Sequence, residues 1–598
     1  MSGRRRSRKS SPRGSSRPSA ERLPAFFPTL VLLNGNIKTM DSTRPSAEAV
    51  ALFGEHILAI GSNKTIKQIA DSETQIVDLR GATVLPGFID CHSHLVEFGL
   101  SMRNLDLRET RSIEELKSLV SNKTTEASRW ILGRGWDQEQ FAERRYPAKY
   151  DLDEVSPDKP VFLRRVCGHI AVANSAALRE AKITSATTDP VGGIIDRDNS
   201  GEPTGILREQ ATDLVERYIP EPSAEDCETA ALAAGRIAVG AGLTSVHCII
   251  SSERELRALL NLKLEGRLPL RFYVFIPPEQ MGAIKQLGLT RGFGDDWVRL
   301  GGIKLFVDGS LGARTAALEA PYTDQKDNRG VAIYTQKDLD RVVAECHLEN
   351  LQVAIHAIGD RAIAMALDSV RKVKSGAPHK DSRHRIEHAS VLNPELVHLF
   401  KHLEVIASVQ PHFVVSDFWI EQRLGRERSK YAYSFSSLLR AGVMTVAGSD
   451  CPIEPLSPLQ GIQAAVTRPG SDEAIGVEDA VKMYTRNAAY ASFEEKTKGT
   501  ISPGKLADMV VLSRDPYLVP ANSIKQIDVL MTIVGGRIVY SSPSCPKLVK
   551  KEHNATDRAS SVLKSNRKED RNLQTRQTAS QQTAFIKVYS TRDQLTFA

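Results

Sequence analysis

Eight short apolar runs follow one another through the middle of the chain, and most of them end in a polar side chain. Their lengths suit β-strands, and stretches with helical periodicity, such as 337–350 and 360–373, separate most of them. Repeated alternation of strand and helix predicts an α/β fold, and eight repeats predict a (β/α)8 TIM-like barrel. The eight runs are residues 87–95, 243–250, 270–276, 301–309, 351–359, 384–390, 405–412 and 444–450.

The segments before and after the eight runs have a different pattern, in which short β-rich runs are separated by turn residues. Near the end of the chain, Gly535 and Gly536 stand between two apolar runs, as in a β-hairpin. We therefore predict one small composite β-sandwich built from both chain ends, residues 25–85 and 500–543. The barrel would then occupy residues 86–499, inserted between the two halves.

The first two barrel runs are separated by about 140 residues, which is far longer than an ordinary strand–helix connection. We interpret this interval, about residues 100–235, as an insertion that covers the mouth of the barrel. Within it, Asn174 is expected to cap a helix that begins at the following serine.

Basic charge is concentrated in the two ends of the chain. Residues 1–24 hold eight Arg or Lys against one Glu, and residues 545–598 hold eleven against five acidic residues. The formal net charge of +7 therefore leaves the body mildly acidic, so we expect no nucleic-acid binding there. Both tails, 1–24 and the low-complexity segment 544–598, are expected to be disordered because they have few apolar residues to bury.

Seven scattered cysteines, none with Cys-x-x-Cys spacing, argue against a disulfide framework and favour a reducing compartment. The chain shows no apolar stretch long enough to cross a membrane. We therefore expect a cytoplasmic protein with no membrane partner. Nuclear or organelle targeting by the basic N-terminal tail stays open.

Polar residues at the ends of the runs are candidates for chemistry. His92 and His94 lie two residues apart, so strand alternation places both on one face. Buried imidazoles need partners, which leaves three interpretations: a metal site, an acid/base site, or two hydrogen-bonded core histidines. The carboxyl ends of barrel strands meet at one mouth, and four imidazoles with a carboxylate suit Zn²⁺ or a similar divalent metal. The other candidates at this mouth are Lys304, His356, His388 and Asp450.

Six segments at these run ends carry a resemblance to a known family. PGFIDCHSHL, GIKLFVDGSLGART, AIHAIGDRAI, RHRIEHAS, SVQPHF and AGSDCPIEP together resemble the amidohydrolase superfamily, and in particular its amidohydrolase-3 branch, which includes N-substituted formamide deformylases. The resemblance covers roughly residues 28–543 and leaves out only the tails. It implies a barrel with a mononuclear or binuclear metal centre.

The resemblance also implies a role for each ligand. The two histidines of the first run would bind the more buried metal, and those of the fifth and sixth runs would bind a second one. Lys304, converted by CO₂ to a carbamate, would bridge them, and Asp450 would contact metal and act as the catalytic proton shuttle. The implied cofactor is one or two divalent metals per chain, most simply Zn²⁺. The implied metal ligands are His92, His94, carboxylated Lys304, His356, His388 and Asp450.

The implied reaction is the hydrolysis of a non-peptide C–N bond in an amide or formamide. Metal-bound hydroxide would attack the carbonyl, and Asp450 would pass the proton to the leaving nitrogen. Two alternatives stay open: a hydrolase of a cyclic amide, an ester or a carbamate, and a catalytically weak regulatory or binding protein on the same scaffold. The partner would be a small-molecule substrate, and the resemblance allows a homodimer.

Further residues are candidates for substrate binding, each with a structural alternative. Asp308 faces substrate or caps a turn, and Arg314 binds a substrate carboxylate or carbonyl or forms a salt bridge. Trp136 lines the pocket or packs in the insertion. We expect Glu387 to anchor His388 or a neighbouring loop rather than to react. The substrate-binding candidates are Trp136, Asp137, His169, Asp308, Arg314 and His412.

Overall fold

A computed structural model describes residues 27–125, 128–165, 170–190, 193–376, 381–468 and 472–545. These residues all belong to one compact unit. The predicted tails lie outside the described residues, except for Ser544 and Cys545. No helix in the described part of the chain is long and apolar enough to cross a membrane.

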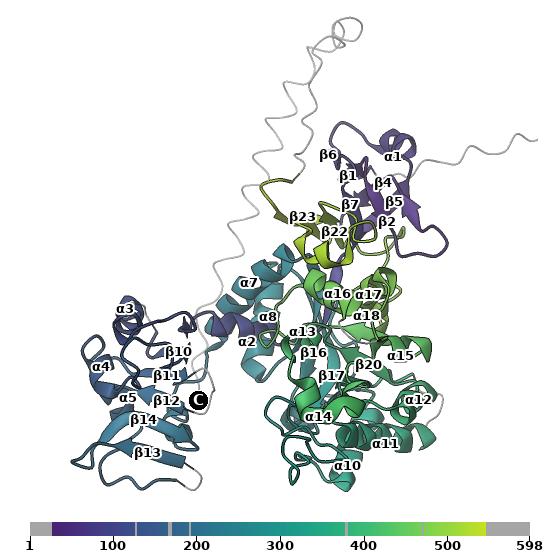
Figure 1. Cartoon of the computed structure of the whole chain (residues 1–598). Coiled ribbons are helices and arrows are strands. Elements are labelled where there is room, and N and C mark those ends of the chain that lie inside the picture. Colours follow the sequence, from purple (N-terminus) through teal and green to yellow (C-terminus); the bar gives the residue numbers. More distant parts are fainter. Residues whose placement is uncertain are drawn as a thin grey trace, which may run out of the picture. The chain divides into compact units, whose positions relative to one another are not determined.

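Both ends of the described chain build one β-sandwich, as predicted. Strand β7 (Thr83–Pro86), which directly precedes the first barrel strand, pairs antiparallel with β22 (Met509–Leu512) from the other end of the chain. Figure 1 shows the two strands side by side. Leu32, Val84 and Met509 belong to the apolar core that joins its two sheets. The first sheet has the order β5 (His56–Gly61), β4 (Ala49–Phe53), β1 (Leu30–Leu33), β6 (Gln75–Asp78), and the second the order β24 (Arg537–Ser541), β23 (Val529–Val534), β22 (Met509–Leu512), β7 (Thr83–Pro86), β2 (Asn36–Lys38), β3 (Ser46–Ala47).

Eight parallel strands form the barrel, and each predicted apolar run overlaps one of them. Strand β15 (Leu243–Ile249) shows why the apolar runs are so clear in the sequence, because every one of its residues is buried. Parallel strands covered by helices are buried on both faces and therefore read as continuous apolar runs. The strands, in spatial order, are β8 (Phe88–Ser93), β15 (Leu243–Ile249), β16 (Arg271–Ile276), β17 (Val298–Phe306), β18 (Gln352–Ala357), β19 (Arg385–His388), β20 (Ile406–Val409) and β21 (Thr445–Ala447).

Helices separate the barrel strands and cover the sheet (Figure 1). Helix α7 (Ala224–Gly240) shows ordinary capping chemistry at its start. The Ser223 hydroxyl accepts a hydrogen bond from the backbone N–H of Asp226, and the Asp226 carboxylate accepts one from the backbone N–H of Ser223. The main helices are α2 (Leu95–Ser101), α7 (Ala224–Gly240), α8 (Glu253–Leu264), α9 (Met281–Gln286), α10 (Gln336–Leu348), α11 (Asp360–Gly376), α12 (Pro394–His402), α13 (Phe413–Ser416), α14 (Ile420–Ser429), α15 (Phe435–Arg440), α16 (Pro458–Thr467), α17 (Val477–Met483) and α18 (Arg486–Ala491).

The barrel closes between its first and last strands through a seam of isolated contacts. No regular ladder joins β8 to β21 in the described sheet; Ser93 and Cys451 form a single bridge. The backbone N–H of Asp450 donates to the carbonyl of His92 at 2.7 Å, and that of His94 donates to the carbonyl of Cys451 at 2.8 Å. The seam therefore lies among the predicted ligands.

The long interval between the first two barrel strands forms a separate sheet with its own apolar cores. Asn174 caps α5 (Ser175–Glu180), as predicted. Helix α7 packs against α2 and β15, so the barrel resumes at Ala224, earlier than the predicted boundary near 235. A position of the insertion over the barrel mouth stays a prediction. Its strands have the order β13 (Gly193–Arg197), β14 (Pro203–Glu209), β12 (Ile170–Ala173), β11 (Val161–Arg165), β10 (Ile131–Trp136), β9 (Leu105–Asp106), and its other helices are α3 (Ile113–Lys123), α4 (Lys149–Asp153) and α6 (Asp213–Glu216).

Candidate metal centre

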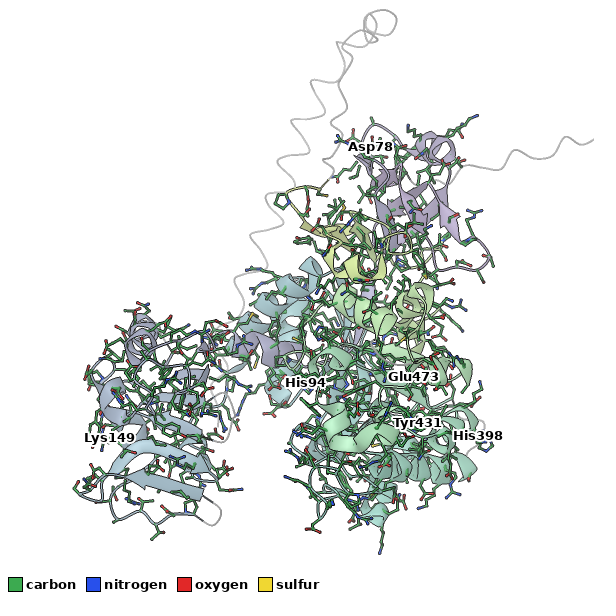
Figure 2. All side chains as sticks on the ribbon, in the orientation of Figure 1. Asp78, His94, Lys149, His398, Tyr431 and Glu473 are labelled. Carbon is green, nitrogen blue, oxygen red and sulfur yellow. The ribbon has the colours of Figure 1, made fainter. Side chains whose placement is uncertain are left out.

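His92 and His94 meet Asp450 at the carboxyl end of the first barrel strand. His92 lies within β8, and His94, labelled in Figure 2, follows directly as the residue before α2. Oδ1 of Asp450 lies 3.2 Å from Nε2 of His92 and 3.5 Å from Nε2 of His94. One ligand atom from each of the three residues lies within 4.8 Å of the others, which is close enough for one metal ion to bind all three.

Lys304 reaches the same point from β17. Its Nζ lies 3.2 Å from Nε2 of His92, and the side chain is buried. Burial lowers the pKa of Lys304 to about 8, because an ammonium loses its hydration inside the barrel. The neutral amine is therefore a minor form, about a tenth at pH 7, but far more abundant than for an exposed lysine.

His356 and His388 extend the cluster from β18 and β19. The rings of His356 and His388 have centroids 4.3 Å apart, and the His388 ring lies 4.9 Å from that of His92. Burial, followed by the nearby charge of Lys304, lowers the pKa of His356 to about 3; burial likewise holds the pKa of His388 well below its usual value. Both imidazoles are neutral at physiological pH, which is the form that binds a metal.

The backbone at two of the predicted ligands, His388 and Asp450, leaves the ordinary strand conformation. Strict alternation would place His388 on the face opposite Glu387, but its φ of 70° turns the chain at this point. Asp450 also has a left-handed backbone, with φ of 60°. Beside it, a Cβ on Gly448 would lie 2.4 Å from the backbone nitrogen of His92, so only glycine allows this close approach.

Asp450 is held as an anion. Burial alone would raise its pKa, but a proton shared with the imidazoles of His92 and His94 outweighs burial and holds the pKa of Asp450 well below the usual range. The carboxylate is therefore available as a metal ligand and as a proton acceptor.

A second carboxylate lies behind His92. Oε2 of Glu387 is 2.5 Å from Nδ1 of His92, so Glu387 contacts the histidine of the first strand rather than the expected His388. Arg385 donates to both oxygens of Glu387. Sequence reasoning missed Arg385, although its spacing of two residues from Glu387 in RHRIEH places both side chains on one face of β19.

The donor set fits a divalent metal. With Nδ1 of His92 engaged by Glu387, Nε2 carries the lone pair and faces Oδ1 of Asp450, a second acceptor, at 3.2 Å. Two acceptors at this distance need a proton or a cation between them. His388 adds a buried Nδ1 that makes no hydrogen bond to any described residue. Neutral imidazoles and a carboxylate around one point are the ligands that zinc-like metals prefer.

Three other predicted site residues have structural partners near the barrel mouth. The Asp308 carboxylate accepts three backbone N–H bonds, from Ala317, Ile358 and Gly359, and its Oδ1 lies 3.6 Å from Nε2 of His356. Asp308 therefore fixes the loops beside His356, a predicted ligand. Arg314 forms an ion pair with Asp324 at 2.8 Å, and His412 bonds to Glu454. A substrate contact by any of the three stays a prediction.

The remaining candidates come from the insertion. Trp136 is fully buried in the insertion core, where its indole N–H donates to the carbonyl of Leu163 at 2.9 Å. Asp137 forms an ion pair with Arg165 at 2.6 Å. Both contacts are of the kind that structural side chains make. Substrate binding by Trp136 or Asp137 stays a prediction. His169 lies outside the described residues.

Known proteins resemble this chain over almost all of its described length. The model of the Amidohydrolase family matches residues 75–540. YtcJ of Bacillus subtilis, assigned by name to the amidohydrolases, is 36% identical over 85% of this chain and 98% of its own. The N-substituted formamide deformylase of Arthrobacter pascens is 27% identical over 86% of this chain and 98% of its own.

A solved structure shows the same architecture. An uncharacterized metal-dependent hydrolase from Pyrococcus furiosus has a TM-score of 0.73 at 35% identity, covering 82% of this chain and 99% of that one. The family match, the relatives and the barrel with its cluster of histidines, lysine and aspartate agree with one another. The chain therefore belongs to the amidohydrolase family.

Proposed function

We propose that this amidohydrolase cleaves a non-peptide C–N bond in an amide or formamide. The observation that carries the proposal is the convergence of His92, His94 and Asp450 on one point, with Lys304 against His92. Such a set suits hydrolysis, because it can hold a metal and move a proton at the same place. The relative named as an N-substituted formamide deformylase supports the choice of bond.

The residues that would hold the metal are those of the cluster. Zn²⁺ is the first choice because the ligands are imidazole nitrogens and carboxylate oxygens. When bound, the metal would polarise the substrate carbonyl and lower the pKa of a water molecule. Lys304 is proposed to react as a neutral amine with CO₂, losing one proton and forming a C–N bond to give a carbamate. The carbamate would exchange a buried cation for an anion with two ligand oxygens.

Asp450 is the proposed proton shuttle. Its carboxylate is ionised and lies within 3.5 Å of both His92 and His94. It would accept the proton of the attacking water and then donate it to the nitrogen that leaves, so the amine departs neutral. The neutral imidazoles of His356 and His388 would support the ligand set without competing for this proton.

The test is metal analysis followed by a substrate panel with the purified full chain. We expect one or two equivalents of divalent metal, and hydrolysis of some N-formyl or N-acyl amines but slower hydrolysis of matched esters. Asp450→Asn should lower turnover by at least about a hundredfold, as expected for loss of general acid–base catalysis. A wild-type chain that binds no divalent metal would refute the proposal, and faster ester than amide hydrolysis would refute the choice of bond.

A further inference from the structure

The carboxylate of Glu387 lies behind the metal centre, on the side of His92 that faces away from Asp450. Nδ1 of His92 and Oε2 of Glu387 are 2.5 Å apart, and neither side chain is exposed. We propose that Glu387, oriented by Arg385, is a positioning residue that holds His92 as the Nδ1–H tautomer and so keeps its Nε2 free for the metal. This inference rests on the metal site of the proposed function and gives Glu387 no contact with substrate.

Arg385 fixes the orientation of the carboxylate. Its Nε donates to Oε1 of Glu387, and its Nη2 lies 3.0 Å from Oε2. The rest of the guanidinium is also engaged: Nη1 lies 2.8 Å from Nδ1 of His247, and Nη2 donates to the Ser408 hydroxyl at 2.7 Å and to the carbonyl of Cys91. A planar guanidinium held on so many sides leaves its carboxylate partner little freedom to rotate.

The fixed carboxylate determines which nitrogen of His92 carries the proton. An ionised carboxylate accepts hydrogen bonds and cannot donate one, so the facing Nδ1 of His92 must carry hydrogen. Nε2 then bears the lone pair, and this nitrogen faces Asp450 at 3.2 Å and Lys304 at 3.2 Å. The charge of Arg385 offsets that of Glu387, so the pair orients the ligand without adding net negative charge behind the metal.

A purely structural role for Glu387 would be to neutralise the buried Arg385. The two roles differ in Glu387→Gln, which preserves shape and an oxygen. Arg385 offers only N–H groups, so the amide oxygen of the glutamine should turn to Arg385 and its NH₂ should face His92. His92 would then accept at Nδ1 and carry its proton on Nε2, the nitrogen that the metal needs.

The first experiment measures Zn²⁺ and Co²⁺ dissociation constants of the full chain by competition with a chelator, together with the visible spectrum of the Co²⁺ form. We expect Glu387→Gln to weaken metal binding by about 10- to 100-fold and to change the Co²⁺ spectrum, as for other partners of ligand histidines. Glu494→Gln is the matched control, because Glu494 lies 2.8 Å from Lys498 in another buried ion pair. It also leaves a buried cation without its carboxylate, yet should bind metal like the wild type.

The second experiment does not depend on a variant that folds. A crystal structure of the metal-loaded wild-type chain should show Nε2 of His92 on the metal and Nδ1 at hydrogen-bond distance from Glu387. Metal on Nδ1, or Glu387 itself on the metal, would overturn the inference, as would wild-type affinity and spectrum in Glu387→Gln. A wild type that binds no metal would remove the proposed function as well, whereas equal binding by wild type and Glu387→Gln would remove only the role of Glu387.

Discussion

At the scale of single residues, Lys304 is the most unusual member of the candidate centre, because it is a buried lysine among the predicted metal ligands. We expect Lys304→Ala to lose most hydrolytic activity, and acetate or another short carboxylate to restore part of it by occupying the space of the proposed carbamate. The measurement is the rate with and without millimolar carboxylate. Lys498→Ala is the control, because it removes another buried lysine that bonds Glu494 and Ser245. Equal rescue of both variants would contradict the carbamate.

The convergence of His92, Lys304 and Asp450 could be predicted because their residue types carry the chemistry and barrel topology brings the strand ends together. The partners of Arg314 and His412 could not. Asp324 and Glu454, which bind them, lie on loops whose courses no local pattern describes. The pairing of Glu387 with His92 escaped prediction because it joins side chains of two strands, β19 and β8, that lie far apart in the sequence.

At the scale of elements, the turn that follows β21 determines where Asp450 lies. We expect Gly448→Ala to destabilise the fold by about 1–3 kcal/mol, the usual cost of overpacking, and to weaken metal binding by displacing β8. The reason is the 2.4 Å approach of its Cβ to the backbone nitrogen of His92. Thermal unfolding and metal competition would measure both effects.

Gly282→Ala serves as the control for this change. Gly282 lies in α9, and a Cβ there meets no atom within 4 Å, so stability should hold or rise slightly. Unchanged metal affinity in Gly448→Ala would show that the turn tolerates displacement and that Asp450 is placed by other contacts.

The barrel strands could be predicted because burial on both faces leaves an apolar run in the sequence. Their exact ends could not. The left-handed backbones at His388 and Asp450 end the strand conformation at residues that are not glycine, so no glycine marks these positions in the sequence. The return from the insertion to the barrel also shifted, from about 235 to Ala224, because α7 is alanine-rich and its packing face is set by α2.

At the scale of the whole molecule, the proposed metal ligands come from the carboxyl ends of both the first and the last barrel strand. A metal bound to His92, His94 and Asp450 would therefore stabilise the folded barrel. At a free metal concentration about a hundred times Kd, the gain in free energy of unfolding is about 2.7 kcal/mol. Differential scanning calorimetry with metal and with chelator should show a higher Tm for the metal-loaded chain.

Two variants identify the site responsible. His398, labelled in Figure 2, stacks on His402 along α12 and is the kind of pair that takes up stray metal, so His398→Ala should keep the full shift. His94→Ala should lose most of it. A full shift in His94→Ala would mean that the stabilising metal binds elsewhere.

The seam between β8 and β21 has a kinetic consequence. The seam depends on the backbone amides of His94 and Asp450, two of the proposed ligand residues. A bound ion would therefore hold the first and last barrel strands together. Release of the ion and hydrogen exchange at these two amides would then be one event with one rate. A chelator could remove the metal only when the seam between β8 and β21 opens. The rate of metal loss to the chelator would then equal the rate of this opening.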